Sequence, residues 1–332
     1  MKKDSIGRYV RMTILCGLLA VAGLQPGQVM AQTLQKVTAE EADYTDSRYY
    51  PGFSKDADEV TLYGLTEEDR TKLWSVLKEG FLAGAVQIDV SSYGLSMSEF
   101  QTEYISLLQN DATLFFVDTS YRSYNENGRV TSVLPQYTDA EEDADTMLAE
   151  MDAEAEEAVK NVTPDMTAYE KALVIHDWLA VHCAYDYDNY KANQVPQISH
   201  TAYGALVDQK AVCDGYAKAY AYIMQEKLGI PCTVVASDSM AHAWNMIKLG
   251  EQYYHVDVTW DDPVFDKMGY AGHDYFLKSA AQMKADKRPH TGWASDVEAT
   301  DGTTYGSAQW KDTESSVIKY GDSWYYLQTE GG

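Results

Sequence analysis

The sequence predicts an α+β protein, and three patterns support this prediction. Apolar residues at helical spacing and short strand-like runs follow one another between residues 62 and 137. Within that stretch Asn127-Gly128 separates two strand-like runs, which is a strong signal for a β-hairpin. Farther along, a helix that is predicted to begin at Cys213 precedes one buried strand and a second hairpin. Helices and antiparallel strands are therefore expected in both halves of the chain.

The first 31 residues have the pattern of a secretory signal peptide. Four basic residues lead into an apolar run from Met12 to Leu24, and the small residues around Ala31 suit cleavage by signal peptidase. The run is too short to span a bilayer, and no other stretch approaches the roughly 20 apolar residues of a membrane helix. We therefore expect a secreted or cell-surface protein outside the cytoplasm, with no membrane insertion after the signal is removed.

The charge balance argues against nucleic acid as a partner. The 332 residues include 26 basic and 51 acidic side chains, which gives a net charge of −25. Without residues 1–31 the net charge is about −28, because that segment holds more basic than acidic residues. Phosphate backbones and anionic membrane surfaces repel such a protein at ordinary salt. The acidic excess is explained most simply by solubility, and it does not indicate an oligomeric state.

Residues 32–138 are predicted to form a small N-terminal α+β region. A helix is expected after Thr66, a strand at 86–90, and a second helix before the hairpin, whose strands cover 114–124 and 130–137. The residues behind these predictions are Leu73, Val76, Leu77, Gly80 and Phe81 in the first helix, Val86, Ile88 and Val90 in the strand, and Phe100, Tyr104, Leu107 and Leu108 in the second helix.

Residues 139–295 are predicted to form the main domain, and residues 296–332 a C-terminal hairpin or tail. An acidic helix over 139–162 is expected to turn its charged face to solvent. Thr167 and Glu170 have the spacing of a capping box, which opens the next helix. The apolar stripe of that helix is Ala172, Ile175, Leu179 and Cys183. In the tail, strands are expected at 317–320 and 324–327, around Gly321-Asp322.

Cys213 is predicted to stand at the N-terminus of a helix that continues to Leu228. The unpaired backbone amides and the positive end of the helix dipole stabilise a thiolate at such a position, and the same amides can bind an oxyanion. A lone cysteine is more often a small buried apolar residue. A catalytic role for Cys213 therefore depends on suitable partners elsewhere in the chain.

The second hairpin supplies two such partners. If Gly250-Glu251 is a two-residue loop, His242 and Asp257 become diagonal neighbours on one face of the paired strands 242–249 and 253–260. Diagonal neighbours are roughly 7–8 Å apart at the backbone, which lets a carboxylate reach an imidazole nitrogen. Such a carboxylate stabilises the imidazolium that holds a thiolate. We therefore predict a Cys213, His242, Asp257 triad, with Asp257 facing a pocket or solvent.

Ordered motifs between Tyr169 and Pro263 resemble those of bacterial transglutaminase-like domains. They are Tyr169-Glu170-Lys171-Ala172, His176-Asp177-Trp178-Leu179, Tyr185-Asp186-Tyr187-Asp188, Ala202-Tyr203-Gly204-Ala205-Leu206, Lys210-Ala211-Val212-Cys213-Asp214-Gly215-Tyr216, His242-Ala243-Trp244-Asn245 and Tyr254-His255-Val256-Asp257-Val258-Thr259-Trp260-Asp261-Asp262-Pro263. Segments 107–111 and 114–117 resemble, more loosely, a region that accompanies such domains in secreted Gram-positive proteins.

This resemblance implies a papain-like core, in which the helix that bears the nucleophile packs on an antiparallel sheet. By motif, Cys213, His242 and Asp257 inherit the three catalytic roles. The implied chemistry is attack of the cysteine on an amide to form a thioester, which water or an amine resolves, as in a cysteine protease or an acyltransferase. The implied substrates are proteins, peptides or cell-envelope material. The family also contains members that have lost catalysis.

No cofactor and no metal site are expected. His176 and His182 are six residues apart on one helix, which is poor spacing for shared ligation, so structural roles are favoured. Asp261-Asp262 with Asp266 lacks the alternate ligand positions and the glycine of a calcium loop.

Four other residues have side chains that suit roles in or near the site. Tyr203 could lend a second oxyanion donor and Trp244 could line the site, but aromatic packing is favoured for both. Cys183 and Cys232 could form a disulfide in an exported protein or could be two sheltered thiols, and the sequence leaves both open.

Two alternatives to a simple enzyme remain open. A non-catalytic surface or binding module could keep this fold, and the 26 tyrosines of the chain would suit a recognition surface. The N-terminal region could instead act as a lid or prosegment over the cleft, which is suggested only by its position in the chain.

Overall fold

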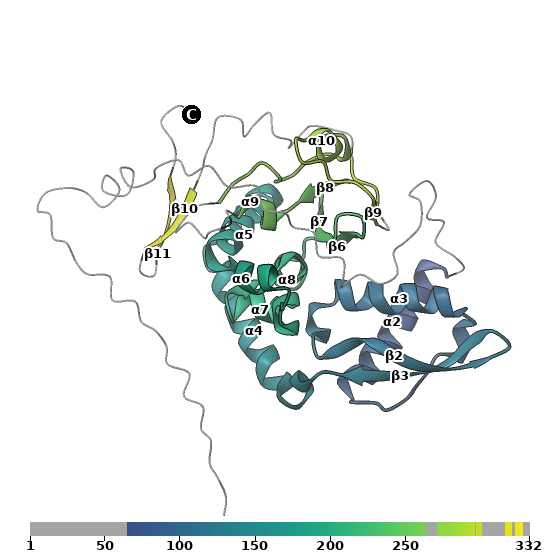
Figure 1. Ribbon diagram of the computed structural model, residues 1–332. Coiled ribbons are helices and arrows are strands. Elements are labelled where there is room, and N and C mark those ends of the chain that lie inside the picture. Colours follow the sequence, from purple (N-terminus) through teal and green to yellow (C-terminus); the bar gives the residue numbers. More distant parts are fainter. Residues whose placement is uncertain are drawn as a thin grey trace, which may run out of the picture. The chain divides into compact units, whose positions relative to one another are not determined.

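A computed structural model of the chain describes residues 65–262, 264, 271–295 and 297–300, and the backbone of two strands at 316–320 and 323–327 (Figure 1). The chain divides into two compact units, Met1–Glu40 and Glu41–Gly332, and every element described below belongs to the second. The predicted signal peptide lies outside the described residues. Among those residues, none of the helices combines the length and apolar character that crossing a membrane requires.

The N-terminal region contains two helices, as predicted. Helix α2, Glu67–Leu82, begins after Thr66, whose side chain accepts the Asp69 amide, and it buries Leu73, Leu77 and Phe81. The predicted face also included Val76, but that side chain is 37% exposed. Residues four apart line up along a helix, and Val76 lies about 100° around the axis from Leu77, so it turns toward solvent. Helix α3, Met97–Asn110, begins with a Ser96–Glu99 capping box.

The predicted hairpin is present and belongs to a three-stranded antiparallel sheet of order β1-β3-β2. Strands β2, Val117–Glu126, and β3, Arg129–Tyr137, are joined by Asn127 and Gly128 with φ of 51° and 77°. Positive φ at both loop positions is what a tight hairpin turn requires. Strand β1 covers only Ile88–Asp89, which is shorter than the predicted strand at 86–90. Val86 precedes the paired residues, and its side chain is 84% exposed.

The main domain begins with two helices that share one apolar core. The predicted acidic helix starts with a 3₁₀ turn, η3, Asp139–Asp143, and continues as α4, Ala144–Val159. Helix α5, Ala168–His182, begins with the predicted Thr167–Glu170 capping box. The shared core includes Met151, Ala155 and Ala158 of α4, and Ala172, Ile175 and Leu179 of α5.

Five short elements connect α5 to the helix that carries Cys213. They are β4, Ala184–Tyr185; α6, Tyr187–Ala192; the 3₁₀ turn η4, Gln197–His200; α7, Ala202–Leu206; and β5, Lys210–Ala211. Strands β4 and β5 pair in parallel. The last of these elements leads directly into α8.

Helix α8, Cys213–Tyr222, packs against a four-stranded antiparallel sheet of order β8-β7-β6-β9 (Figure 1). The strands are β6, Cys232–Ser237; β7, His242–Leu249; β8, Gln252–Val256; and β9, Trp293–Ala294. The buried Asn245 side chain of β7 donates to the carbonyl of Ala217 on α8 at 2.9 Å. The predicted helix to Leu228 changes after α8 into a π-helical turn, η5, Ile223–Lys227.

The remaining elements follow the sheet. Asp257 leads into α9, Val258–Asp261, and α10 covers Ala280–Ala285. The predicted tail hairpin consists of β10, Ser316–Tyr320, and β11, Ser323–Leu327, in which Tyr320 pairs with Ser323.

Candidate active site

Cys213 is the first residue of α8, as predicted, and it is 7% exposed. The preceding residue, Val212, offers no side chain to cap the helix. The first amides of α8 are therefore not used by a capping side chain, and they lie beside the sulfur of Cys213. This is the arrangement that favours a thiolate and can receive an oxyanion.

The first turn of α8 is fixed to the chain that precedes it. The Val212 amide donates to the Ser199 carbonyl at 2.9 Å. A Cβ at Gly215 would lie 2.6 Å from that same carbonyl oxygen, so this close approach requires glycine. Asp214 pairs with His200 Nδ1 at 2.9 Å. Burial acts to raise the pKa of Asp214, but the neighbouring His200 and Lys218 charges lower it by more. The net pKa is therefore below its ordinary value, and the carboxylate stays ionised.

His242 and Asp257 meet as predicted, although the backbone around Asp257 differs from the prediction. The hairpin register is as expected from Leu249 opposite Gln252 to Asn245 opposite Val256. His242 Nε2 lies 2.6 Å from Asp257 Oδ2. The sequence predicts that the strand continues to Trp260, whereas β8 ends at Val256 and Asp257 caps α9.

Asp257 is also wholly buried, so the expectation that it faces a pocket or solvent is wrong. Its Oδ1 accepts a hydrogen bond from the Trp260 amide at 3.2 Å, as an aspartate commonly does at the N-cap of a helix. The alternation of polar and apolar residues at 254–260 resembles a strand, and it hides this short helix.

The ring of His242 interacts with both Asp257 and Cys213. Nε2 is engaged by Asp257, and the buried Nδ1 has no hydrogen-bond partner among the described residues, so Nδ1 is the nitrogen left to act on the Cys213 thiol. Burial alone would lower the pKa of His242, but Asp257 and Cys213 raise it to about 10. Burial likewise acts to raise the pKa of Asp257, and the His242 and His290 interactions reverse this and lower it. The arrangement stabilises an imidazolium beside a carboxylate.

His290 is a site residue that sequence reasoning missed. Its Nε2 lies 2.8 Å from Asp257 Oδ2, the same oxygen that His242 contacts. It follows Asp257 by 33 residues and lies beyond the motifs that resemble a known family. No local pattern around Arg288-Pro289-His290 points to this contact, because it depends on the return of the chain after α10.

Trp244 and His255 form a buried pair beside the site. Trp244 Nε1 donates to His255 Nδ1 at 2.9 Å, and the Trp244 ring stacks on His242 with centroids 5.6 Å apart. Burial, with the nearby His290 and Lys284, lowers the pKa of His255 to about 3, so this ring is neutral. The packing role that was favoured for Trp244 agrees with these contacts.

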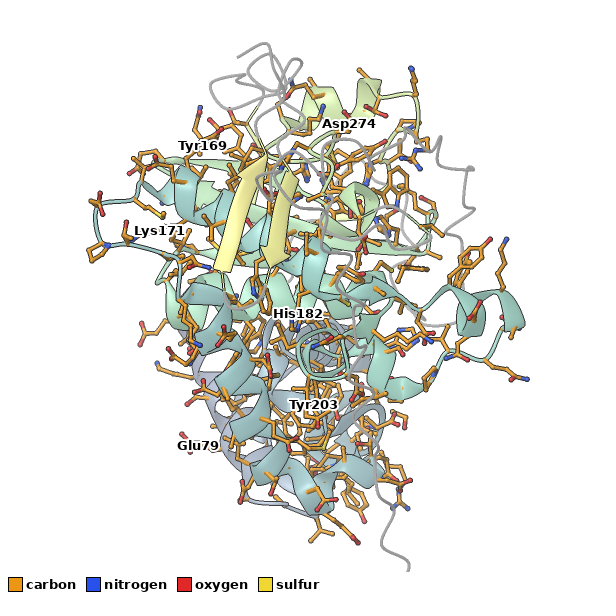
Figure 2. All side chains as sticks on the ribbon, turned by 90° about the vertical axis from the view of Figure 1, so that its left-hand side faces the viewer. Glu79, Tyr169, Lys171, His182, Tyr203 and Asp274 are labelled. Atoms are coloured by element: carbon orange, nitrogen blue, oxygen red, sulfur yellow. The ribbon has the colours of Figure 1, made fainter. Side chains whose placement is uncertain are left out.

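Tyr203 does not direct its hydroxyl to an oxyanion site beside the Cys213 amide. The hydroxyl of Tyr203, which is labelled in Figure 2, donates to Glu150 Oε2 of α4 at 2.6 Å, and the ring contacts Phe115. Because the hydroxyl is engaged by Glu150, the structure gives no support to Tyr203 as a second oxyanion donor. Cys183 and Cys232 are buried thiols that no disulfide joins.

His176 and His182 serve separate contacts, as their spacing indicates. His182 Nε2 contacts the Leu206 carbonyl at 2.7 Å. His176 is wholly buried, with Nδ1 at 2.9 Å from Asp177 and Nε2 at 3.1 Å from Asp261. Asp266, the third residue of the calcium pattern that was considered, lies outside the described residues.

Two groups in the described part of the chain combine donor types that could hold a metal. They are His176 with Asp177 and His273, and His242 with Asp257 and His290, and within each group the donor atoms lie within 4.8 Å of one another. In both groups these atoms are at hydrogen-bond distance from a carboxylate of the same group. Hydrogen bonding therefore explains both groups without an ion.

The stability of the fold should depend on the charge of His176. Burial would lower its pKa, but Asp177 and Asp261 raise it to about 9. A raised pKa contributes stability that is complete below about pH 6.5 and is lost as pH rises toward 9. We expect His176→Gln to lower the free energy of unfolding by about 1–3 kcal/mol at pH 6 and by less at pH 9. Urea unfolding at several pH values measures this, and a difference that stays constant with pH would contradict it.

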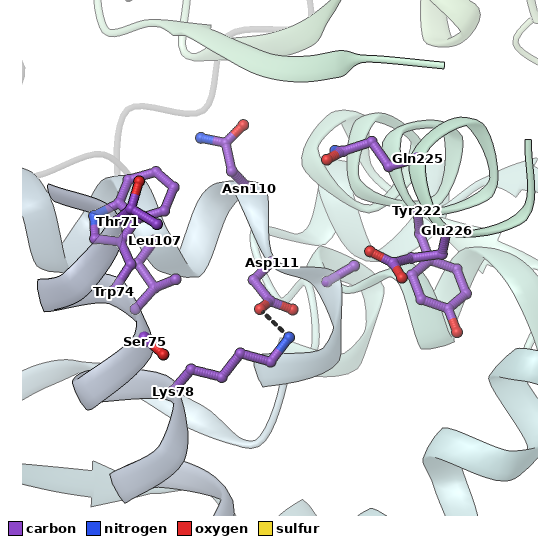
Figure 3. Close-up of a pocket in the computed structure, with 11 residues that line it drawn as sticks. Thr71, Trp74, Ser75, Lys78, Leu107, Asn110, Asp111, Tyr222, Gln225 and Glu226 are labelled. Atoms are coloured by element: carbon purple, nitrogen blue, oxygen red, sulfur yellow. Dashed lines mark ion pairs between the residues drawn. The ribbon is translucent and has the colours of Figure 1, made fainter. Parts of the chain in front are cut away.

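A cavity of about 310 Å³ lies between the N-terminal region and the end of α8 (Figure 3). The ion pair between Lys78 and Asp111, at 2.6 Å, is part of its lining, as is Tyr222, the last residue of α8. Nearby, Asn110 Oδ1 accepts the Val234 amide at 3.0 Å. The cavity is at the Tyr222 end of α8, opposite Cys213, so it gives no support to the hypothesis of an N-terminal lid.

Residues 155–258 match the family model described as "Transglutaminase-like superfamily". Over this segment the chain is similar to that superfamily. It includes α5, α8 and β6 to β8, and it contains Cys213, His242 and Asp257. The predicted architecture, a helix with the cysteine on an antiparallel sheet within an α+β chain, is therefore confirmed for this segment.

Two solved structures align with part of the chain. One, described as "Crystal structure of a TGase", is 17% identical, covers 50% of this chain and 49% of its own, and has a TM-score of 0.29. Another, from Cytophaga hutchinsonii and described as "a Putative Cysteine Protease", is 14% identical, covers 42% of this chain and 61% of its own, and has a TM-score of 0.26. No curated protein matches the chain.

Proposed function

We propose that this protein is an extracytoplasmic cysteine enzyme that cleaves or transfers at amide bonds through a thioester on Cys213. The proposed substrates are proteins, peptides or cell-envelope material. The observation that carries the proposal is the environment of the His242 ring: Asp257 lies 2.6 Å from Nε2, Nδ1 is buried with no hydrogen-bond partner among the described residues, and Asp257 and Cys213 together raise the pKa of the ring. The extracytoplasmic location rests on the signal-like pattern of residues 1–31.

In the proposed reaction, His242 accepts the thiol proton of Cys213, and Asp257 stabilises the resulting imidazolium. The thiolate attacks the amide carbonyl carbon while the first amides of α8 bind the oxyanion. When the C–N bond breaks, His242 gives its proton to the departing amine. Water then resolves the thioester to an acid, or a second amine resolves it to a new amide, and Cys213 is released.

The burial of the three residues bears on how a substrate would approach. Cys213 is 7% exposed, whereas His242 and Asp257 are wholly buried. An acyl donor would therefore meet the sulfur first, while the base and its carboxylate stay shielded from water. Shielding strengthens the attraction within the imidazolium–carboxylate pair, because the local dielectric constant is low.

The proposal is tested by the rate at which iodoacetamide alkylates Cys213 at pH 7, located by peptide mass. We expect a rate well above that of an ordinary thiol, and a fall of at least about tenfold in His242→Ala. Cys213→Ser shows how much label reaches other cysteines. A slow rate that is equal in wild type and His242→Ala would contradict the proposal and favour a non-catalytic binding module.

A further inference from the structure

The carboxylate of Asp257 has more donors than a single histidine supplies. Its Oδ1 accepts the Trp260 amide at 3.2 Å, and its Oδ2 lies 2.6 Å from His242 Nε2 and 2.8 Å from His290 Nε2. A carboxylate with three donors keeps its charge and has little freedom to rotate. His290 and His242 approach the same oxygen, so His290 fixes the atom on which His242 depends.

Among the described residues, the His290 side chain has Asp257 as its one hydrogen-bond partner and otherwise lies among aromatic rings. The ring is wholly buried, with centroids 4.8 Å from Trp244, 4.2 Å from Trp260 and 5.2 Å from Tyr275. Within the part of the chain that the structure describes, its Nδ1 has no hydrogen-bond partner. A phenylalanine would fill a similar volume without a buried, unpaired nitrogen, so packing alone does not explain a histidine here. The contact with Asp257 does explain it.

The protonation of His290 also suits a donor role. Burial lowers its pKa more than Asp257 raises it, so the ring is neutral at pH 7 and carries one N–H. Since Nε2 faces a carboxylate oxygen, that hydrogen belongs on Nε2. The other ionisable groups that act on this ring are His242 and Asp286, and it acts in turn on His255. Arg288 lies over the neighbouring rings of Trp260 and Tyr275.

We propose that His290 is a positioning residue, which donates from Nε2 to Asp257 and thereby holds that carboxylate ionised and turned toward His242. The inference rests on the proposed function, because its consequence is felt through the Cys213–His242 pair. With the His290 donor removed, the proton shared by Asp257 and His242 moves toward Asp257, and the carboxylate gains freedom to rotate. Both changes weaken the imidazolium that supports the thiolate.

The tautomer of His290 is the first test, and it needs no activity. In the full chain labelled with ¹⁵N-histidine, the His290 signals are assigned by their loss in His290→Gln. We expect a neutral ring protonated on Nε2 between pH 6 and 8. A ring protonated on Nδ1, with a bare Nε2, cannot donate to Asp257 and would overturn the proposal.

The second test compares two substitutions of His290 with a matched control. His290→Phe keeps the aromatic volume but removes the donor, whereas the amide of His290→Gln can place an N–H near the position of Nε2. His182→Phe also removes one histidine hydrogen bond, at a ring that stacks on Trp178 away from the site. Circular dichroism and thermal unfolding confirm that each variant is folded before its rate is measured.

We expect His290→Phe to lower the pH 7 alkylation rate of Cys213 at least about tenfold and to move the acid limb of the pH profile to higher pH. His290→Gln should recover most of the rate, and His182→Phe should match wild type. Equal rates and profiles in His290→Phe and wild type, with His242→Ala still slow, would overturn the role of His290 and leave the proposed function standing. If His242→Ala is also as fast as wild type, the proposed function itself fails. If His290→Phe does not fold, His290→Gln and the tautomer decide.

Discussion

Replacement of Cys213 by alanine is expected to abolish acyl transfer while the protein keeps its fold. A suitable probe is p-nitrophenyl acetate, because a thiolate displaces nitrophenolate and leaves an acetyl thioester on the enzyme. We expect wild type to gain one acetyl group by intact mass and to turn over, and Cys213→Ala to release nitrophenolate at least about 10³-fold more slowly. The substitution removes one sulfur at a helix terminus, so the unfolding midpoint should change little.

The same experiment distinguishes the fates of the thioester. Added glycinamide should give N-acetylglycinamide if an amine resolves the thioester, and acetate alone if only water does. Turnover of the probe by Cys213→Ala at the wild-type rate would contradict the assignment of the nucleophile. Cys183→Ala, which changes a buried thiol on the α5 side of the core, is the matched control and should leave the acetyl adduct in place.

Asp257→Asn is expected to have the second large effect, through the protonation of His242. Burial alone would lower the pKa of His242. The charge and hydrogen bond of Asp257 are the largest effects that raise it, and the pKa reaches about 10. An asparagine has no charge, so the pKa of His242 should fall below its ordinary value and the imidazolium should be lost at pH 7. We expect the acetylation rate to fall by about 10²–10⁴-fold.

The measurement is the acetylation rate from pH 5 to 9, together with ¹⁵N signals of His242. In wild type His242 should stay protonated across this range, and in Asp257→Asn it should be neutral at pH 7. Glu251→Gln, a charge-neutralising change at an exposed loop, serves as the control. A protonated His242 in Asp257→Asn would show that the carboxylate does not set its charge, and would contradict this account of the site.

Much of this site was predictable because its residues lie on regular elements with strong local signals. The capping box at Thr167, the glycine turn at Asn127-Gly128 and the two-residue loop at Gly250-Glu251 each fix a boundary by local physics. The register at Gly250 then pairs β7 with β8 as far as Asn245 and Val256, and Asp257 follows that last pair directly, so local signals alone place it near His242.

What the sequence could not predict depends on long-range packing. The burial of Asp257 follows from the segment 271–295 that returns over it, and the contact of His290 with Asp257 follows from the same return. The buried His176–Asp261 contact likewise joins residues that are 85 positions apart. Local periodicity gives no information on such contacts, because they depend on where two distant segments meet.

The nucleophile and its base belong to different layers of the domain. Cys213 begins α8, whereas His242 begins β7, and the bond from Asn245 to Ala217 is one of the ties that hold helix and sheet together. The reactivity of the thiol is therefore a property of tertiary packing and not of either element alone. A state that kept its helices and strands but loosened the contact between helix and sheet would react with iodoacetamide only at the rate of an ordinary thiol. The alkylation rate of Cys213 therefore reports on native packing more sensitively than secondary structure does.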